Sequence, residues 1–372
     1  MNPTILYALI GLAAFLVSLG VTPLMIRLAV RWGALDRPGN GKIHTRSVPR
    51  LGGLAIIISF YLATGLACLL GCWKFNGGNL HYLGIVFGGA IIVALGIYDD
   101  KKGAKAPLKF VVQIIAALVL VGFGYDIEMM TNPFGGQLLV GWWGVPLIVL
   151  WIVLLTNAIN LIDGLDGLAC GVAAIAGIIL FFAAFSDGPF VPILAVALTG
   201  ACLGFLRYNF YPARVFLGDT GSLFLGFVLA ALSIQGSFKT TAGMALALPL
   251  VALLVPLADT GVAFFRRLFS GRHPFRADQR HFHHRLLAMG YSQSQAVLLL
   301  YTLQINLGII ALVLKFAGRT LAVSMLILLA VMMFVFFKLM EQFRLSVGKL
   351  ANDGKPISQD GSRRPRPKGT FR

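Results

Sequence analysis

Residues 143–169 read WGVPLIVLWIVLLTNAINLIDGLDGLA, an apolar run that ends in amides and carboxylates. The apolar part, 143–161, is long enough for a helix across a bilayer core of about 30 Å, which takes about 20 residues. Carboxylates are costly next to hydrocarbon and mark functional sites where they occur there. The stretch therefore predicts a membrane-spanning helix that leads into a polar site at a membrane surface.

The whole chain has the composition of a membrane protein. Of its 372 residues, 58% are hydrophobic and 12% are charged, whereas a soluble domain carries about 25% charged residues. We predict an all-α, polytopic helical membrane protein with about eleven transmembrane helices. The loop 124–142 carries turn signals and is expected to form a small hairpin. The predicted spans are residues 4–30, 51–73, 79–98, 107–123, 143–161, 167–185, 189–209, 220–236, 242–264, 294–316 and 319–340.

The basic residues set the predicted orientation. With the N-terminus outside, all but four of the 31 lysines and arginines fall on the cytoplasmic side, as the positive-inside rule requires. The C-terminus is then cytoplasmic. We expect residues 1–340 to form a transmembrane catalytic domain and the basic residues 341–372 to form a disordered tail. Because the net charge of +17 belongs to loops and a tail beside the bilayer, it does not indicate nucleic acid as a partner.

Two adjacent carboxylates, Asp99 and Asp100, close the third predicted span and are followed by four lysines, the last of them Lys109. Neighbouring carboxylates can bind a divalent cation, or keep one proton between them and act as a base. The lysines suit phosphate oxygens. Taken alone, the pair is also compatible with an ordinary charged helix end.

A second polar group ends the fifth predicted span. Asn157, Asn160 and Asp163 recur every three residues, and Asp166 continues the series. Residues at this spacing lie close to one face of a helix. Their oxygens suit a hard cation such as Mg²⁺, which keeps several waters and recruits substrate phosphates. Polar contacts between helices are the alternative role for these side chains.

Residues 214–222, RVFLGDTGS, lead into the eighth predicted span. Gly218 and Gly221 allow the backbone to approach a ligand closely, and amides at a helix start can receive phosphate oxygens. Asp219 can hold a metal ion, and the same residue can cap the helix.

The loop 266–285 gathers arginines and histidines on the predicted cytoplasmic side. Histidine clusters often bind zinc, but the companion residues elsewhere are Asp and Asn, and no cysteine is near. We expect these cations to bind and neutralise a diphosphate, which is the main need of phosphoryl transfer. The candidates are Arg280, His281, His283, His284 and Arg285.

Four motifs together resemble the polyprenyl-phosphate N-acetylhexosamine-1-phosphate transferases. They are DDKKGAKAPLKF (99–110), NAINLIDGLDGLA (157–169), FLGDTGSL (216–223) and DQRHFHHRLL (278–287), and the resemblance extends from residue 36 to about residue 301. It implies transfer of a sugar 1-phosphate from a UDP-sugar to a membrane polyprenyl phosphate, with release of UMP. The implied cofactor is Mg²⁺ or Mn²⁺.

The resemblance also implies residue roles. Asp219 and Asn160 match the family's metal-binding residues, and Asp99 and Asp100 match its essential pair, which deprotonates or positions the lipid phosphate. We also assign Asn157 and Arg280 to substrate binding. The other implied site residues are Phe216 stacked on uracil, Lys109 on phosphate, Asp163 and Asp166 in the nucleotide-binding stretch, and His281, His283, His284 and Arg285 beside the diphosphate and sugar.

The interrupted histidine run resembles one branch of the family. HFHHRLL with the following GYSQSQAVLLLY is similar to the N-acetylglucosamine-1-phosphate transferases of O-antigen, common-antigen and teichoic acid linkage synthesis. The phospho-N-acetylmuramoyl-pentapeptide transferases, the alternative, tend to carry three consecutive histidines, whereas Phe282 interrupts the run here. We expect undecaprenyl phosphate and UDP-N-acetylglucosamine as substrates, in the inner membrane of a bacterium. For the oligomeric state, a homodimer is one of the alternatives.

Two further alternatives concern class and mechanism. A transporter would place its polar groups near the midplane of the bilayer, whereas these lie at predicted helix ends. For the reaction, we expect direct attack of the lipid phosphate on the β-phosphorus of the UDP-sugar. A covalent aspartyl-phosphate intermediate is the alternative.

Overall fold

The structure is a computed structural model of the chain. It describes residues 3–38, 47–72, 78–127, 129–131, 137–237, 254–257, 261 and 286–316, with a few positions between 321 and 331. The chain divides into two units, Met1–Ala317 and Gly318–Arg372, and every element described below belongs to the first.

The described residues are predominantly helical. Six helices are long and apolar enough to cross a membrane: α1 (Pro3–Arg31), α3 (Gly78–Lys102), α5 (Gly144–Ile162), α7 (Phe190–Asn209), α8 (Gly218–Ser237) and α12 (Gln293–Phe316). Three shorter apolar helices accompany them: α2 (Gly53–Leu69), α4 (Ala106–Gly122) and α6 (Leu168–Ala184). The protein is therefore a polytopic helical membrane protein.

The predicted spans up to residue 236, and the span 294–316, each correspond to one of these helices within a few residues. The third span was predicted to end at residue 98, but α3 continues through Asp99 and Asp100 to Lys102. The two carboxylates are accommodated there because the protein supplies their partners: Asp99 accepts the amide of Ala104, and Asp100 accepts the amides of Asp219 and Thr220. The predicted spans 242–264 and 319–340 lie almost entirely outside the described residues.

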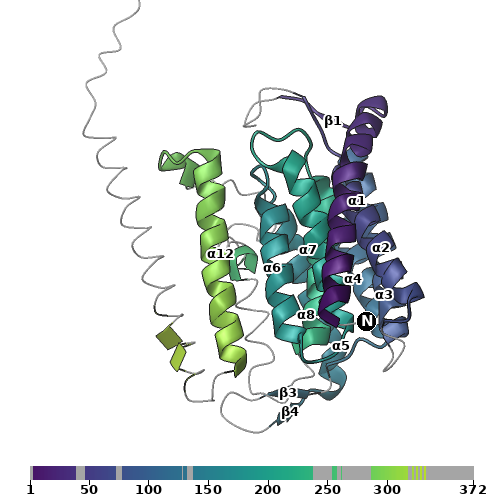
Figure 1. The fold of residues 1–372 in the computed structure, drawn as a ribbon, viewed down its shortest axis with the longest axis vertical. Helices are drawn as coiled ribbons and strands as arrows, with labels where there is room; N and C mark the ends of the chain where they lie inside the picture. Colours follow the sequence, from purple (N-terminus) through teal and green to yellow (C-terminus); the bar gives the residue numbers. More distant parts are fainter. Residues whose placement is uncertain are drawn as a thin grey trace, which may run out of the picture. The chain divides into compact units, whose positions relative to one another are not determined.

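The helices of the first unit pack side by side (Figure 1), and α8 contacts five of them. Helix α8 contacts α2, α3, α5, α6 and α7, and its apolar side chains are almost completely buried. Helix α1 packs along α7 and α2, and α12 packs along α6. Because α8 is surrounded by other helices, a residue at its first turn is held from several sides.

Glycines allow the helices to touch at the start of α8. A Cβ built on Gly53 of α2 would lie 2.3 Å from the Cα of Gly221, and one on Gly96 of α3 would lie 2.3 Å from the Cα of Thr220. Small residues at such contacts let helix backbones approach in a membrane. These two glycines therefore allow α2 and α3 to pack directly against the backbone of the first turn of α8.

Two small antiparallel ladders connect helices. Strands β3 (Met129–Thr131) and β4 (Gln137–Leu139) form the hairpin predicted for the loop 124–142, and a short 3₁₀-helix, η1 (Gly141–Trp143), follows it. The second ladder, between β1 (Leu35–Asp36) and β2 (Val48–Pro49), was not predicted. It leads the chain directly into α2.

Candidate active site

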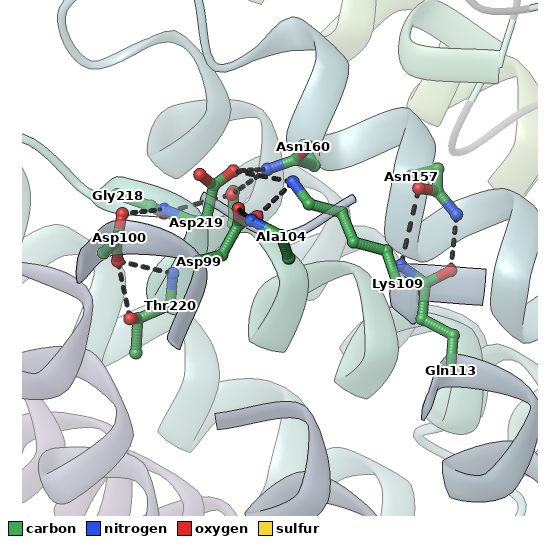
Figure 2. Close-up of polar contacts among 11 residues, drawn as sticks. Asp99, Asp100, Ala104, Lys109, Gln113, Asn157, Asn160, Gly218, Asp219 and Thr220 are labelled. Carbon is green, nitrogen blue, oxygen red and sulfur yellow. Dashed lines mark hydrogen bonds and ion pairs between the residues drawn. The ribbon is translucent and has the colours of Figure 1, made fainter. Parts of the chain in front are cut away.

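Four helices bring polar side chains together at one end of the bundle, which we call the polar end (Figure 2). It is the end at which α3 and α5 finish and α4, α6 and α8 begin. Asp99 comes from α3, Lys109 from α4, Asn160 from α5 and Asp219 from α8. The structure thus brings together four of the predicted site residues from distant parts of the sequence.

Lys109 is the cation of this cluster. Its ammonium pairs with Oδ2 of Asp99 and lies 3.9 Å from Oδ1 of Asp219. The amide of Ala104 donates to Oδ1 of Asp99 at 2.7 Å. The Asp99 side chain is only 5% exposed, whereas that of Asp219 is 29% exposed. Lys109 therefore joins a buried carboxylate to one that reaches the surface.

Asp100 faces the first turn of α8. Its Oδ1 accepts the amide of Asp219 at 2.9 Å, and its Oδ2 accepts the amide of Thr220 at 3.0 Å and the hydroxyl of Thr220 at 2.6 Å. The first amides of a helix have no partner within the helix, and a carboxylate is well suited to them. Asp100 is thus an N-terminal cap supplied by a different helix.

Asn160 lies directly beside Asp219. Its amide nitrogen donates to Oδ1 of Asp219 and to the hydroxyl of Ser222 at 2.8 Å. The Ser222 hydroxyl in turn donates to the carbonyl of Gly218 at 3.1 Å. The two residues that the sequence predicts as metal ligands are therefore neighbours, held by the first turn of α8.

Asn157, one turn earlier on α5, is engaged by a residue that the sequence reasoning missed. Its amide nitrogen donates to Oε1 of Gln113 at 2.6 Å, and the amide of Gln113 donates back to Asn157 at 3.4 Å. Gln113 is completely buried and lies one turn after Lys109 on α4. A polar residue at position 113 inside an apolar run was the signal that could have identified it.

The turn between α5 and α6, residues 163–167, carries the other two predicted aspartates. Oδ2 of Asp166 accepts the amide of Ala213 at 2.9 Å. Asp163 follows the last residue of α5 directly, and its burial raises its pKa well above the usual value. The charges of Asp219, Asp100 and Asp166 raise that pKa further, so Asp163 is close enough to these carboxylates to be repelled by them.

The loop before α8 is fixed by the start of α2, which sequence reasoning did not foresee. The amide of Phe216 donates to the carbonyl of Pro49 at 2.8 Å, and the amides of Gly52 and Gly53 donate to the carbonyls of Phe216 and Leu217. Gly218 has a φ of 73°, and a Cβ there would lie 2.3 Å from the Arg50 carbonyl. Phe216, the predicted uracil-stacking residue, is half-buried in this loop.

The side chains at the polar end fit a magnesium ion. Asp219 offers a carboxylate next to the Asn160 amide. A 180° flip of this amide would exchange its nitrogen for its oxygen, which can bind a metal ion. Among the residues that the structure describes, no three His, Cys, Asp or Glu side chains form a closed set of ligands. Mg²⁺ is commonly held by one or two carboxylates and completes its shell with water and substrate phosphates. An open oxygen site with excess negative charge meets that need.

The remaining predicted site residues belong to the loop 266–285 and lie outside the described residues. They are Arg280, His281, His283, His284 and Arg285.

Comparison with known proteins identifies the family. The profile of "Glycosyl transferase family 4" matches residues 82–237. The chain is 39% identical over 329 residues to the "Probable undecaprenyl-phosphate N-acetylglucosaminyl 1-phosphate transferase" of Bacillus subtilis, covering 86% of this chain and 89% of the relative. It is 37% identical over 332 residues to the "Decaprenyl-phosphate N-acetylglucosaminephosphotransferase" of Mycolicibacterium smegmatis, covering 82% and 80%.

A relative with a different sugar donor in its name is also similar. The "Phospho-N-acetylmuramoyl-pentapeptide-transferase" of Desulforudis audaxviator is 32% identical over 329 residues, covering 80% of this chain and 95% of the relative. With the fold and the polar end, these matches define a membrane-embedded phosphoglycosyl transferase. The chain belongs to glycosyl transferase family 4, among the polyprenyl-phosphate N-acetylhexosamine-1-phosphate transferases.

Proposed function

We propose that the protein transfers N-acetylglucosamine 1-phosphate from UDP-N-acetylglucosamine to undecaprenyl phosphate and releases UMP. The lipid-diphosphate sugar formed would initiate synthesis of a cell-envelope polysaccharide. The observation that carries the proposal is Lys109 between Asp99 and Asp219, beside Asn160, at the end of a membrane helix bundle. The relatives named for N-acetylglucosamine are 39% and 37% identical, against 32% for the muramoyl relative. The more similar of the first two is named for undecaprenyl phosphate.

Asp99 and Lys109 are the proposed site of the lipid phosphate. An ammonium has three donor directions, so Lys109 can bind a phosphate oxygen while it stays paired with Asp99. Asp99 takes a proton from the lipid phosphate or fixes its position. An oxygen of the lipid phosphate then attacks the β-phosphorus of the donor. The bond from this phosphorus to the bridging oxygen breaks, and UMP leaves with the electron pair.

Asp219 and Asn160 are the proposed ligands of Mg²⁺ or Mn²⁺. When bound, the ion supplies positive charge that neutralises the diphosphate. The first turn of α8 holds Asp219, and the Asn160 amide donates both to the Asp219 carboxylate and to the hydroxyl of Ser222. Lys109 adds a second positive charge 3.9 Å from the same carboxylate oxygen.

The two members of the acidic pair have different proposed roles. Asp99 contacts Lys109, which makes it the candidate base or orienting group for the lipid phosphate. Asp100 accepts hydrogen bonds from two amides and a hydroxyl of α8, so its lone pairs are engaged in holding Asp219. We therefore assign catalysis to Asp99 and positioning to Asp100.

The nucleotide is proposed to bind along the turn 163–167 and the loop before α8. Asp163 and Asp166 lie on the turn, and Phe216 lies on the loop, where its ring would stack on uracil. Asn157 is proposed to orient α4 through Gln113 as well as to bind substrate. The loop residues Arg280, His281, His283, His284 and Arg285 keep their proposed contacts with the diphosphate and sugar.

The proposed topology has about eleven spans, with the N-terminus outside and the polar end in the cytoplasm, because the loops there carry most of the basic residues. Residues 1–340 would form the catalytic domain and 341–372 the tail. In a variant without native cysteines, a membrane-impermeant thiol reagent should label Ser186→Cys in intact spheroplasts. It should label Lys105→Cys only after permeabilisation, and the reverse pattern would overturn the orientation.

The substrate is tested with purified protein, undecaprenyl phosphate and Mg²⁺. The two donors are UDP-N-acetylglucosamine and UDP-N-acetylmuramoyl-pentapeptide, each labelled in the sugar. We expect label in the lipid fraction from the first donor. Label that enters lipid only from the second would show that the protein is a muramoyl-pentapeptide transferase.

A further inference from the structure

The turn 163–167 is held by a helix that lies outside residues 82–237, the part of the chain that the family profile matches. The hydroxyl of Tyr301, on α12, donates to the carbonyl of Gly167 at 2.6 Å. Gly167 is the residue before α6, with a φ of 82°, and its carbonyl also accepts the amide of Gly171 at 2.9 Å. Tyr301 thus binds the residue at which the turn becomes a helix.

The tyrosine ring lies directly on the backbone of α6. A Cβ built on Gly171 would lie 1.9 Å from the hydroxyl oxygen of Tyr301 and 2.1 Å from its Cζ atom. Any side chain at position 171 would therefore push the ring away. We call the Gly167 carbonyl and the bare surface at Gly171 the tyrosine seat.

Two further contacts fix α12 along the length of α6. Gly308 of α12 accommodates Ile179 of α6, whose Cδ1 would lie 2.1 Å from a Cβ at position 308. Near the end of α12, the ammonium of Lys315 pairs with Asp187 at 3.0 Å and donates to the carbonyl of Ala183. These three contacts fix the axial position of α12 against α6, so the hydroxyl of Tyr301 is placed beside the turn.

We propose that Tyr301 is a positioning residue for nucleotide-sugar binding. The turn 163–167 is anchored on one side by Asp166 and the amide of Ala213, and on the other by Tyr301 and Gly167. Together these contacts fix the direction in which the turn presents Asp163. The inference rests on the proposed function, because it takes this turn as part of the nucleotide-sugar site.

The chain contains a matched control for this contact. The hydroxyl of Tyr61, on α2, donates to the carbonyl of Ile85 at 3.0 Å, and a Cβ at Gly89 would lie 2.1 Å from that hydroxyl. The carbonyl and the glycine are again four residues apart on one helix. This second contact is in the half of α3 away from Asp99, so it has the same chemistry on helices other than α6 and α12.

The test compares Tyr301→Phe with Tyr61→Phe in the purified full-length protein. Each variant loses one neutral hydrogen bond, so their stabilities should fall by similar amounts. For Tyr301→Phe we expect kcat/KM for UDP-N-acetylglucosamine to fall about three- to tenfold, with KM for undecaprenyl phosphate unchanged. Hydrogen exchange at the amides of residues 163–171 should become faster. Tyr61→Phe should change none of these three quantities.

A steric pair gives a second measurement. Gly171→Ala displaces Tyr301, and Gly89→Ala displaces Tyr61, so only the first should raise KM for the nucleotide sugar. The inference is overturned if Tyr301→Phe matches wild type in kcat/KM, or if Tyr61→Phe lowers it equally. Wild-type protein that transfers nothing from UDP-N-acetylglucosamine would instead refute the proposed function, which keeps the two failures distinct.

Discussion

At the scale of single residues, the adjacent Asp99 and Asp100 point in different directions. Asp99 pairs with Lys109, while Asp100 caps α8 through Asp219 and Thr220. Successive helical residues are about 100° apart around the axis. Two neighbouring carboxylates can therefore serve two different helices, and here Asp99 faces α4 while Asp100 faces α8.

The different contacts predict different kinetics for the two asparagine variants. Asp99→Asn should lower kcat by about 100-fold or more, because it removes the proposed base or orienting group. Asp100→Asn should lower the melting temperature and raise the Mg²⁺ concentration needed for half-maximal rate, because Asp219 loses its support. Steady-state rates across a Mg²⁺ titration measure kcat of Asp99→Asn and the Mg²⁺ dependence of Asp100→Asn, and a thermal melt measures the stability of Asp100→Asn. An Asp100→Asn protein with wild-type Mg²⁺ dependence and stability would contradict its role as a cap.

Asp163 allows a prediction about pH and stability. Its folded-state pKa is raised by burial and by neighbouring carboxylates, so its charged form destabilises the folded protein above that pKa. The cost disappears as the pH falls below the unfolded-state value of about 3.9. In EDTA, Asp163→Asn should therefore raise the melting temperature at pH 8, and the gain should shrink toward pH 5. A loss of stability at pH 8 would show that the charge is compensated.

Some residue-level features could be predicted from the sequence, and others could not. The spacing of Asn160 and Asp163 and the glycines around Asp219 indicated a common site, and the structure brings Asn160 and Asp219 into contact. A polar residue at position 113 marked Gln113 as a candidate, but its pairing with Asn157 was not predictable, because periodicity gives the face of a helix and not the neighbour it meets. Gln113 is in an apolar run whose orientation only the packed bundle reveals.

At the scale of helices, glycine contacts set the position of the first turn of α8. Gly96 is the clearest case, since a Cβ there would lie 2.3 Å from the Cα of Thr220 and 2.8 Å from its nitrogen. These are backbone atoms, which cannot turn aside as a flexible side chain can. The close approach of α3 to the first turn of α8 therefore depends on Gly96.

Gly96→Ala should separate α3 from α8 and weaken the cap that Asp100 provides. A displacement of about 1 Å in a catalytic group can cost about 100-fold in rate, so we expect a loss of that order. Gly20→Ala on α1 is the control, because a Cβ there meets nothing within 4 Å. Turnover and melting temperature of both variants check the prediction. Equal activity of Gly96→Ala and Gly20→Ala would show that the close contact does not position the site.

Helices were easier to predict than the connections between them. Long apolar runs mark spans directly, because a bilayer needs about 20 residues of helix. The β1–β2 ladder and the hydrogen bonds from the start of α2 to the loop at Phe216 have no such signal. They depend on backbone groups far apart in the sequence. The contact of Tyr301 with the tyrosine seat could not be predicted for the same reason, because nothing in the sequence distinguishes Tyr301 from other residues of a span.

At the scale of the whole molecule, the bundle gathers the side chains of the site at one end of its apolar helices. Helix α8 is surrounded by five helices and presents Asp219 at its first turn. In the proposed reaction the acceptor lipid arrives from the bilayer and the nucleotide sugar from water, so their phosphates would meet at such an end. We expect the β-phosphorus of the donor to move to the lipid there.

Labelling of the two donor phosphates shows whether the β-phosphorus moves to the lipid. UDP-N-acetylglucosamine labelled with ³²P at either the α or the β position is incubated with the protein, undecaprenyl phosphate and Mg²⁺, and the lipid is extracted. We predict that the β label enters the lipid and the α label leaves as UMP, and that Asp219→Asn abolishes both while remaining folded in detergent. Sugar in the lipid without the β label, or undiminished transfer by Asp219→Asn, would contradict the account.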